Sequence, residues 1–193
     1  ILVVLVDLIW DKNKVPAMFT AALGLIVAGI VILNGMPETG MIPNNYMVVS
    51  DKLGLYFKFI IVLTTLFILL FTYDSKEIIE SHLRQGEYYA LVYGMVLGMF
   101  FLTSAVDLIL IYIALELLSL SSYVLAGFSD KETRNSEAAV KYLIYGAISS
   151  AFMLFGISLI YGLTGTTNLY GVNEVLSTTV VNIYTLGFAV ILI

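Results

Sequence analysis

The stretch LILIYIALELLSLSSYVLAGFS, residues 108–129, contains one charged residue, Glu116, in an otherwise uncharged run. A helix needs about 20 predominantly apolar residues to cross the ~30 Å hydrocarbon core of a bilayer, and this run is long enough. A charged side chain at that depth costs on the order of 3 kcal/mol on insertion scales. Charged side chains within membrane helices generally serve a function. The stretch therefore predicts a membrane-spanning helix with a functional carboxylate near its middle.

The composition of the chain indicates that lipid surrounds most of it. Hydrophobic residues make up 60% of the sequence and charged residues 12%. Soluble domains contain about 45–50% apolar and about 25% charged residues. We therefore expect an integral membrane protein whose surroundings are the lipid bilayer. No block of lysine and arginine occurs, so no nucleic-acid partner is expected.

Metal and redox chemistry is not expected within these residues. The sequence has no cysteine and a single histidine, His82. The lack of cysteine excludes disulfides, thiolate-bound iron–sulfur clusters and thiolate zinc sites within the chain. The single histidine excludes an imidazole-rich site. We therefore expect no metal and no cofactor bound by this chain itself.

Charged residues divide the sequence into seven apolar runs. They span residues 1–10, 15–34, 53–73, 88–103, 106–128, 136–163 and 178–193. Runs of this length predict an all-α fold, a polytopic transmembrane bundle of about seven helices. The first and last runs are incomplete, so we expect the N-terminal part of a longer protein with residues 1–193 in one membrane domain. Residues 74–87 mix apolar and charged residues, which suits a short helix at the membrane surface.

Capping signals occur at the ends of these runs. Ser104 is the expected N-cap of the run 106–128, with Asp107 reaching back to it in a capping box. The fourth and fifth runs then form a tight helical hairpin. Asn135 is the expected N-cap of the run 136–163. The residues expected to end that run are Gly162, Gly165 and Asn168.

Basic residues between the runs are distributed asymmetrically. The connections after the first, third and fifth runs hold Lys12, Lys14, Lys76, Arg84, Lys131 and Arg134, whereas the other connections hold Lys52. Short cytoplasmic loops carry the excess of lysine and arginine. The odd-numbered connections are therefore predicted to face the cytoplasm.

Glu116 shares one helix face with three hydroxyl groups. Tyr112 comes four residues before it, Ser119 three residues after it, and Tyr123 four residues after Ser119. Such a face can stabilise a buried carboxylate or support a chain of hydrogen-bonded water. The next run carries a similarly isolated Lys141. At ~1.5 Å per residue, Glu116 and Lys141 are expected about 16 Å and 9 Å from the same membrane face. Antiparallel helices could therefore bring them together.

Two alternatives remain open at this point. Lys141 could pair within its own helix with Glu137, four residues earlier in the favourable orientation. Glu116 could stay neutral and only bond a neighbouring helix. If the two charges do meet, their attraction at ~4 Å and an effective dielectric of ~20 is about 4 kcal/mol. Separating them would then favour release of a proton from the lysine.

Three motifs carry a resemblance to a known family. They are EYYALV at 87–92, ALELLSLSSY at 114–123 and NSEAAVKYL at 135–143. Together they resemble the antiporter-like, proton-translocating membrane subunits of respiratory complex I, the NADH:quinone oxidoreductase, and are most similar to its N-subunit type. In that family a glutamate on the helix matched by Glu116 pairs with buried lysines, and a lysine on the next helix is matched by Lys141.

The resemblance implies a subunit of about fourteen helices without redox centres of its own. Proton movement would be driven by quinone reduction elsewhere in a translocating enzyme complex of the bacterial cytoplasmic membrane. The expected partners are other membrane subunits, including further antiporter-like ones, with quinone, NADH, FMN and iron–sulfur clusters in partner subunits. Residues 87–193 would begin the repeat of channel helices and residues 1–86 would precede it. The family also has a lysine on the following, seventh helix, and this lysine is expected beyond Ile193. Ser121 stands where the family often has a proline.

Two other readings are kept. The related one is a subunit of an Mrp-type cation/proton antiporter or of a membrane-bound hydrogenase, because these share the glutamate matched by Glu116. The other is a non-transporting membrane scaffold that only anchors neighbouring subunits. Substitution of Glu116 by glutamine separates the scaffold from the transporters, since only the transporters would change.

Overall fold

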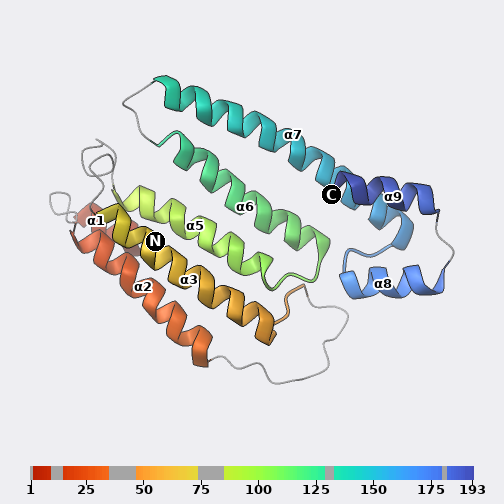
Figure 1. Ribbon diagram of the computed structural model, residues 1–193, viewed down its shortest axis with the longest axis horizontal. Helices are drawn as coiled ribbons and strands as arrows, with labels where there is room; N and C mark the ends of the chain where they lie inside the picture. The colour runs from red at the N-terminus through yellow and green to blue at the C-terminus, as the bar shows by residue number, and fades with distance from the viewer. Residues whose placement is uncertain (1, 10–14, 35–46, 74–84, 129–132, 180–181) are drawn as a thin grey trace.

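The computed structural model describes residues 2–9, 15–34, 47–73, 85–128, 133–179 and 182–193 (Figure 1). The described residues form helices and isolated bridges, with no strand among them, which confirms the predicted all-α class. The helices are α1 (Leu2–Ile9), α2 (Val15–Asn34), α3 (Lys52–Tyr73), α5 (Gln85–Leu102), α6 (Leu108–Ala126), α7 (Thr133–Thr164), α8 (Leu169–Thr178) and α9 (Ile183–Leu192). Residues 74–84, where most of the surface helix was expected, lie outside the described part.

Three of these helices are long and apolar enough to cross a membrane. They are Lys52–Thr72, Leu108–Ala126 and Asn135–Thr164, and the shorter apolar helices are Met18–Asn34, Gly86–Leu102 and Ile183–Leu192. Helix α7 has 32 residues. At ~1.5 Å per residue it measures about 48 Å, well above the ~30 Å of the hydrocarbon core. Part of α7 therefore extends beyond the apolar layer or the helix is tilted within it.

The C-terminal part differs from the prediction. Gly165 has φ +70° and ends α7, as expected, because glycine adopts this left-handed conformation without a steric cost. Asn168 was predicted to help end that helix, but it starts α8 by accepting from Tyr170 N at 3.0 Å. Asn182 caps α9 in the same way. Hydropathy alone predicted a single run, residues 178–193, in this part of the chain. The side-chain caps at Asn168 and Asn182 instead start two separate helices, α8 and α9.

The predicted start of α6 is also corrected. Asp107 is itself the N-cap, and its Oδ1 accepts from Ile109 N at 2.9 Å and Leu110 N at 3.4 Å. Ser104 is buried, and its Oγ makes no hydrogen bond to a described residue. The turn continues past Ser104 because backbone pairing holds it, with Val106 N donating to Met47 O at 2.9 Å. The prediction that Asn135 caps the following helix is wrong, because α7 begins earlier, at Thr133.

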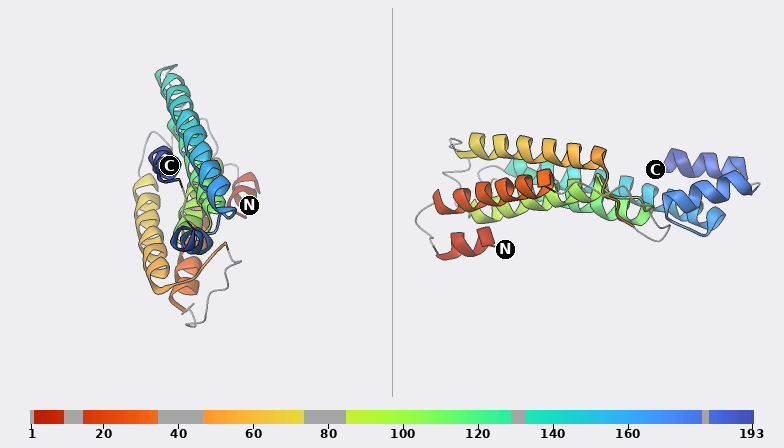
Figure 2. Two further views of the ribbon diagram at one scale, coloured as in Figure 1. Left: turned by 90° about the vertical axis from the view of Figure 1, so that its right-hand side faces the viewer. Right: turned by 90° about the horizontal axis from the view of Figure 1, so that it is seen from below.

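The helices α2, α3, α5, α6 and α7 lie side by side in one view, and α8 and α9 gather at the C-terminal end of α7 (Figure 1). Helix α1 lies on one side of this row, against α2 and α5 (Figure 2). One buried cluster joins α2, α3 and α5 around Leu25, Leu69 and Tyr89. A second joins α6, α7 and α9 around Leu108 and Ile157. The α5–α6 pair connects the two clusters.

Close backbone packing holds α5 against α6, as the predicted hairpin requires. A Cβ added at Gly98 would lie 2.8 Å from Ala114 O, and one at Gly94 would lie 2.7 Å from Ser121 Oγ. Both glycines therefore let α6 approach α5 more closely than any larger residue would allow. Helix α6 runs unbroken through Ser121, whose hydroxyl donates to Leu117 O at 2.9 Å. Packing against α5 thus fixes which face of α6 remains for other contacts.

Candidate functional site

The polar face of α6 points away from α5. Ala114 and Ser121, which contact α5, are 1% and 8% exposed. At ~100° per residue, Glu116 lies about 200° around the helix from Ala114, on nearly the opposite side. Helix α7 occupies that side (Figure 1). The carboxylate therefore faces the α6–α7 interface rather than the tightly packed α5–α6 interface.

Glu116 is half-buried, and its partner on the same helix is Tyr112. Tyr112 lies one turn before Glu116 on the same face of the helix, close enough for the two groups to interact electrostatically. Ser119, one turn further, is also half-buried. The predicted polar face thus holds a carboxylate, with a tyrosine one turn before it and a serine one turn after it.

Tyr123 forms the tightest contact between α6 and α7. It is 7% exposed, and its ring meets the Tyr142 ring edge to face with centroids 4.6 Å apart. Its hydroxyl lies against the α7 backbone, because a Cβ added at Gly146 would be 1.7 Å from Tyr123 Oη. Gly146 is therefore required for the observed position of Tyr123.

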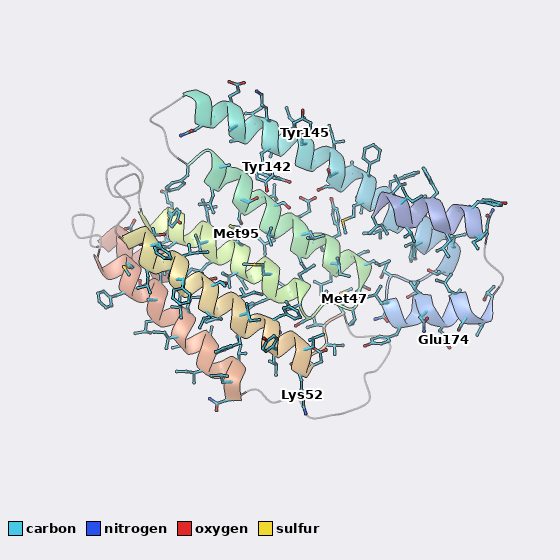
Figure 3. All side chains as sticks on the ribbon, in the orientation of Figure 1. Met47, Lys52, Met95, Tyr142, Tyr145 and Glu174 are labelled. Atoms are coloured by element: carbon cyan, nitrogen blue, oxygen red, sulfur yellow. The ribbon has the colours of Figure 1, made fainter. Side chains whose placement is uncertain are left out.

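Ser122 makes a contact between the helices that the sequence prediction missed. Its Oγ donates to Ser119 O at 2.7 Å and lies 3.3 Å from Tyr142 Oη, to which it can also donate. Tyr142 reaches from α7 toward α6 (Figure 3). The signal was present in the sequence, since Glu116, Ser119 and Ser122 are spaced by three residues and form one row on the helix surface. The row was not recognised because the four-residue spacing to Tyr123 was followed instead.

Lys141 pairs with Glu137 in the described structure. The Nζ to Oε1 distance is 2.5 Å, and the two side chains are 66% and 65% exposed. The open alternative of a pair within α7 is therefore the one that the structure shows. Within the described part of the chain, Lys141 makes no ion pair with Glu116.

The register of the two helices explains why Glu116 and Lys141 do not meet. A Cβ added at Gly127 would lie 2.8 Å from the Cβ of Ala139, so these residues are at the same level. From that level Glu116 is about 16 Å along α6 and Lys141 about 3 Å along α7, at ~1.5 Å per residue. The axial offset is about 14 Å, roughly twice the value expected from the sequence. The first turns of α7 extend beyond the end of α6, which the loop pattern did not reveal.

Asp107 has a structural role at the other end of α6. It is 4% exposed, and its Oδ2 accepts from Thr167 Oγ1 at 2.7 Å. The backbone adds two bonds between the same segments, Leu108 N to Thr167 O and Leu169 N to Val106 O, both 2.9 Å. The start of α6 is thereby joined to the turn between α7 and α8. Among the described residues, no three acidic, histidine or cysteine side chains gather to hold a metal ion.

These features define the class of protein. The chain is an α-helical, polytopic membrane protein in which one carboxylate, Glu116, faces a neighbouring helix from within a membrane span. Acidic groups in this situation occur in proteins that move protons or other ions across membranes.

Comparison with known proteins shows which family this part of the chain resembles. Residues 105–193, which contain the whole of α6 and α7, match the family model described as NADH:quinone oxidoreductase/Mrp antiporter, transmembrane. Over this segment the chain is similar to the NADH:quinone oxidoreductase/Mrp antiporter family. The resemblance predicted from the three motifs is confirmed.

Curated relatives support this assignment over a wider range. The chain is 38% identical over 199 residues to NADH-quinone oxidoreductase subunit N 2 of Chloroherpeton thalassium, which covers 100% of this chain and 38% of the relative. It is 46% identical over 131 residues to NADH-quinone oxidoreductase subunit N 2 of Rhizobium meliloti, covering 68% of this chain and 27% of the relative. The chain thus spans less than two fifths of the length of these relatives.

Solved structures show the same arrangement of helices. The chain superposes on a chain of respiratory complex I from Thermus thermophilus, solved with bound aureothin, with a TM-score of 0.73 and 26% identity. That match covers 98% of this chain and 40% of the other. A chain of the membrane-bound sulfane sulfur reductase, an archaeal respiratory membrane complex, gives a TM-score of 0.74 at 21% identity, with the same coverage. The second match concerns the fold alone.

Proposed function

We propose that this chain is part of a proton-translocating membrane subunit of an NADH:quinone oxidoreductase. The observation that supports it most directly is Glu116, a half-buried carboxylate on the α6 face toward α7, within the segment that matches the family. The proposal places Glu116 and Lys141 as proton-handling groups. Tyr112, Ser119, Tyr123 and Glu137 support them.

In this proposal the two charged groups act at different levels of the membrane. Lys141 pairs with Glu137 near the end of α6 that is marked by Gly127, and Glu116 lies about 14 Å deeper by the helix register. Of the two groups, Glu116 is the one that faces a neighbouring helix from the middle of an apolar span, with Tyr112 and Ser119 on either side of it.

The proposal assigns the rest of the enzyme to other chains. Quinone, NADH, FMN and iron–sulfur clusters would be bound by partner subunits, and quinone reduction there would drive the proton movement here. The partners would be further membrane subunits, including antiporter-like ones, in the bacterial cytoplasmic membrane. The proposed orientation puts the Gly127 end of α6 on the cytoplasmic side, following the bias of lysine and arginine. Residues 87–193 would begin the channel repeat, and the family match at 105–193 lies within them.

The test is Glu116→Gln in the intact complex, reconstituted in vesicles with a pH-sensitive dye. Glutamine keeps the size and the hydrogen-bonding capacity but cannot take up a proton, so we expect assembly to be retained and proton pumping to fall. The matched control is Glu174→Gln, an exposed glutamate on a different helix, α8 (Figure 3). The control should pump as the unchanged protein does. Normal pumping by Glu116→Gln at an unchanged electron-transfer rate would refute the proposal and favour the scaffold reading.

The related candidate is a subunit of a cation/proton antiporter, because the matched family includes Mrp antiporters. The same Glu116→Gln variant would impair both. The two are separated by the energy source: pumping by the oxidoreductase starts when NADH and quinone are added. An antiporter instead acidifies or alkalinises the vesicles when a sodium gradient is imposed.

A further inference from the structure

We propose that the groove between α1, α5 and α6 binds a phospholipid with a primary amine in its headgroup, and that Glu87 selects the amine. The groove has a volume of about 550 Å³, within the ~300–1,000 Å³ that is usual for small-molecule sites in proteins. It is lined by Val4 of α1, by Glu87 and Leu91 of α5, and by Val124 and Phe128 at the end of α6. The inference concerns the lipid around this chain and does not depend on proton translocation.

The groove is polar at the membrane surface and apolar toward the bilayer centre, as a lipid is. Glu87 is in the first turn of α5, and Phe128 follows the end of α6, so both lie where these helices leave the apolar layer. Leu91 and Val124 each lie four residues further in, which is about 6 Å along either helix. Among the described residues that line the groove, Glu87 is the one with a polar side chain. An amphipathic molecule with its polar end at the surface therefore matches the groove.

The charge at the mouth of the groove favours an amine. The Glu87 side chain is exposed, and it forms no ion pair with any residue that the structure describes. Asp7 of α1 supplies a second carboxylate nearby, because a Cβ added at Gly86 would lie 2.8 Å from Asp7 Oδ2. The partial positive charge at the start of α5 stabilises carboxylates in this position. The mouth therefore attracts a headgroup with an ammonium and repels one whose net charge is negative.

The size of the groove favours a lipid over a helix of a partner protein. A helix is about 10–12 Å across, so 550 Å³ would hold only about 5–7 Å of its length, roughly one turn. A single acyl chain is much thinner, so it can follow the groove beside Leu91. Val124 is 54% exposed, so the groove is open to the lipid on the α6 side.

The test uses two phospholipids that carry the same photoreactive acyl chain and differ in the headgroup, which is ethanolamine in one and glycerol in the other. The intact complex is irradiated in vesicles that contain one of the lipids, and the labelled peptides are identified by mass spectrometry. Peptides that contain residues 87–91 or 124–128 should be labelled about threefold more by the ethanolamine lipid, the effect of one exposed ion pair. Glu87→Gln should remove this preference. Glu174→Gln on α8, the matched control, should retain it.

A second pair of variants tests the groove itself. Val124→Phe places a larger side chain in the groove and should lower labelling of these peptides by both lipids. Leu120→Phe adds the same ring one turn away on α6, at a residue that is 52% exposed and does not line the groove, so it should lower neither.

Three results would overturn the inference. The first is equal or absent labelling by the two lipids in the unchanged protein, which would also follow if Glu87 paired with a basic side chain of a protein. The second is a preference for the ethanolamine lipid that persists in Glu87→Gln. The third is a Val124→Phe variant that loses no labelling, or loses no more than Leu120→Phe.

Discussion

Gly146→Ala should loosen the α6–α7 interface. The added methyl group would lie 1.7 Å from Tyr123 Oη and 2.4 Å from Tyr123 Cζ. Since such contacts are essentially never closer than 3.0 Å, either the tyrosine ring or α7 must move by more than an ångström. The ring has little freedom, because Tyr123 is 7% exposed and packs against Tyr142. The helices are therefore expected to separate locally.

The expected loss of stability follows from two opposing effects. Inserting a methyl group into a packed site costs about 1–3 kcal/mol. Replacing glycine by alanine inside a helix gains about 0.5–1 kcal/mol from the reduced backbone entropy. Gly146→Ala should therefore lower the free energy of unfolding by about 0–2.5 kcal/mol. Gly162 lies in the same helix with nothing within 4 Å of an added Cβ, so Gly162→Ala should be neutral or stabilising.

The measurement is unfolding of the full-length subunit in mixed micelles with increasing SDS, followed by circular dichroism. Tyr123→Ala in the Gly146→Ala background removes the obstacle, so the double variant should lose less than the sum of the single losses. The coupling should lie within about 0.5–3 kcal/mol, as for residues in direct contact. Equal stability of the Gly146→Ala and Gly162→Ala variants, or a coupling of zero, would show that the described packing is wrong.

Two further predictions concern the ends of α6. Cysteines introduced in place of Gly127 and Ala139 should cross-link under mild oxidation with a shift of about 1 Å, because disulfides need Cβ atoms about 3.5–4.5 Å apart. Cysteines at Glu116 and Lys141 should not, and rapid cross-linking of that pair would refute the helix register. Asp107→Ala should destabilise the subunit by about 0.5–2 kcal/mol, since it removes an N-cap. Asp107→Asn should lose less in the same SDS titration, because an amide oxygen can still cap the helix; identical losses would argue against the capping role.

The sequence was sufficient to predict the fold class and the polar face of α6. Uncharged runs of spanning length leave few alternatives to a helical membrane protein, because backbone groups in lipid must be bonded within the segment. The four-residue spacing of Tyr112 and Glu116 correctly placed the two side chains on one face of the helix, where they interact. These features depend on local periodicity, which sequence records well.

The relation between α6 and α7 could not be predicted in the same way. The depth of Lys141 was counted from Asn135 as a helix cap, but α7 begins at Thr133 and runs past the end of α6. Which residues stand opposite each other depends on how Tyr123 fits against Gly146. That fit depends on the side chains of both helices, so it cannot be predicted from the pattern of either helix alone. The pair of Lys141 with Glu137, by contrast, lies within α7 and follows from the local four-residue spacing.

Because α6 is attached at Asp107, any tilt of the helix turns it about that end. The Asp107 end is the fixed end, because a carboxylate cap, the Thr167 hydroxyl and paired backbone bonds all hold it there. Displacement therefore grows with distance from Asp107. At ~1.5 Å per residue, a tilt of about 5° moves Glu116 by about 1 Å and Ser122 by about 2 Å. Since Ser122 and Tyr142 are 3.3 Å apart, a tilt that barely changes the surroundings of the carboxylate is large enough to open and close the link to α7.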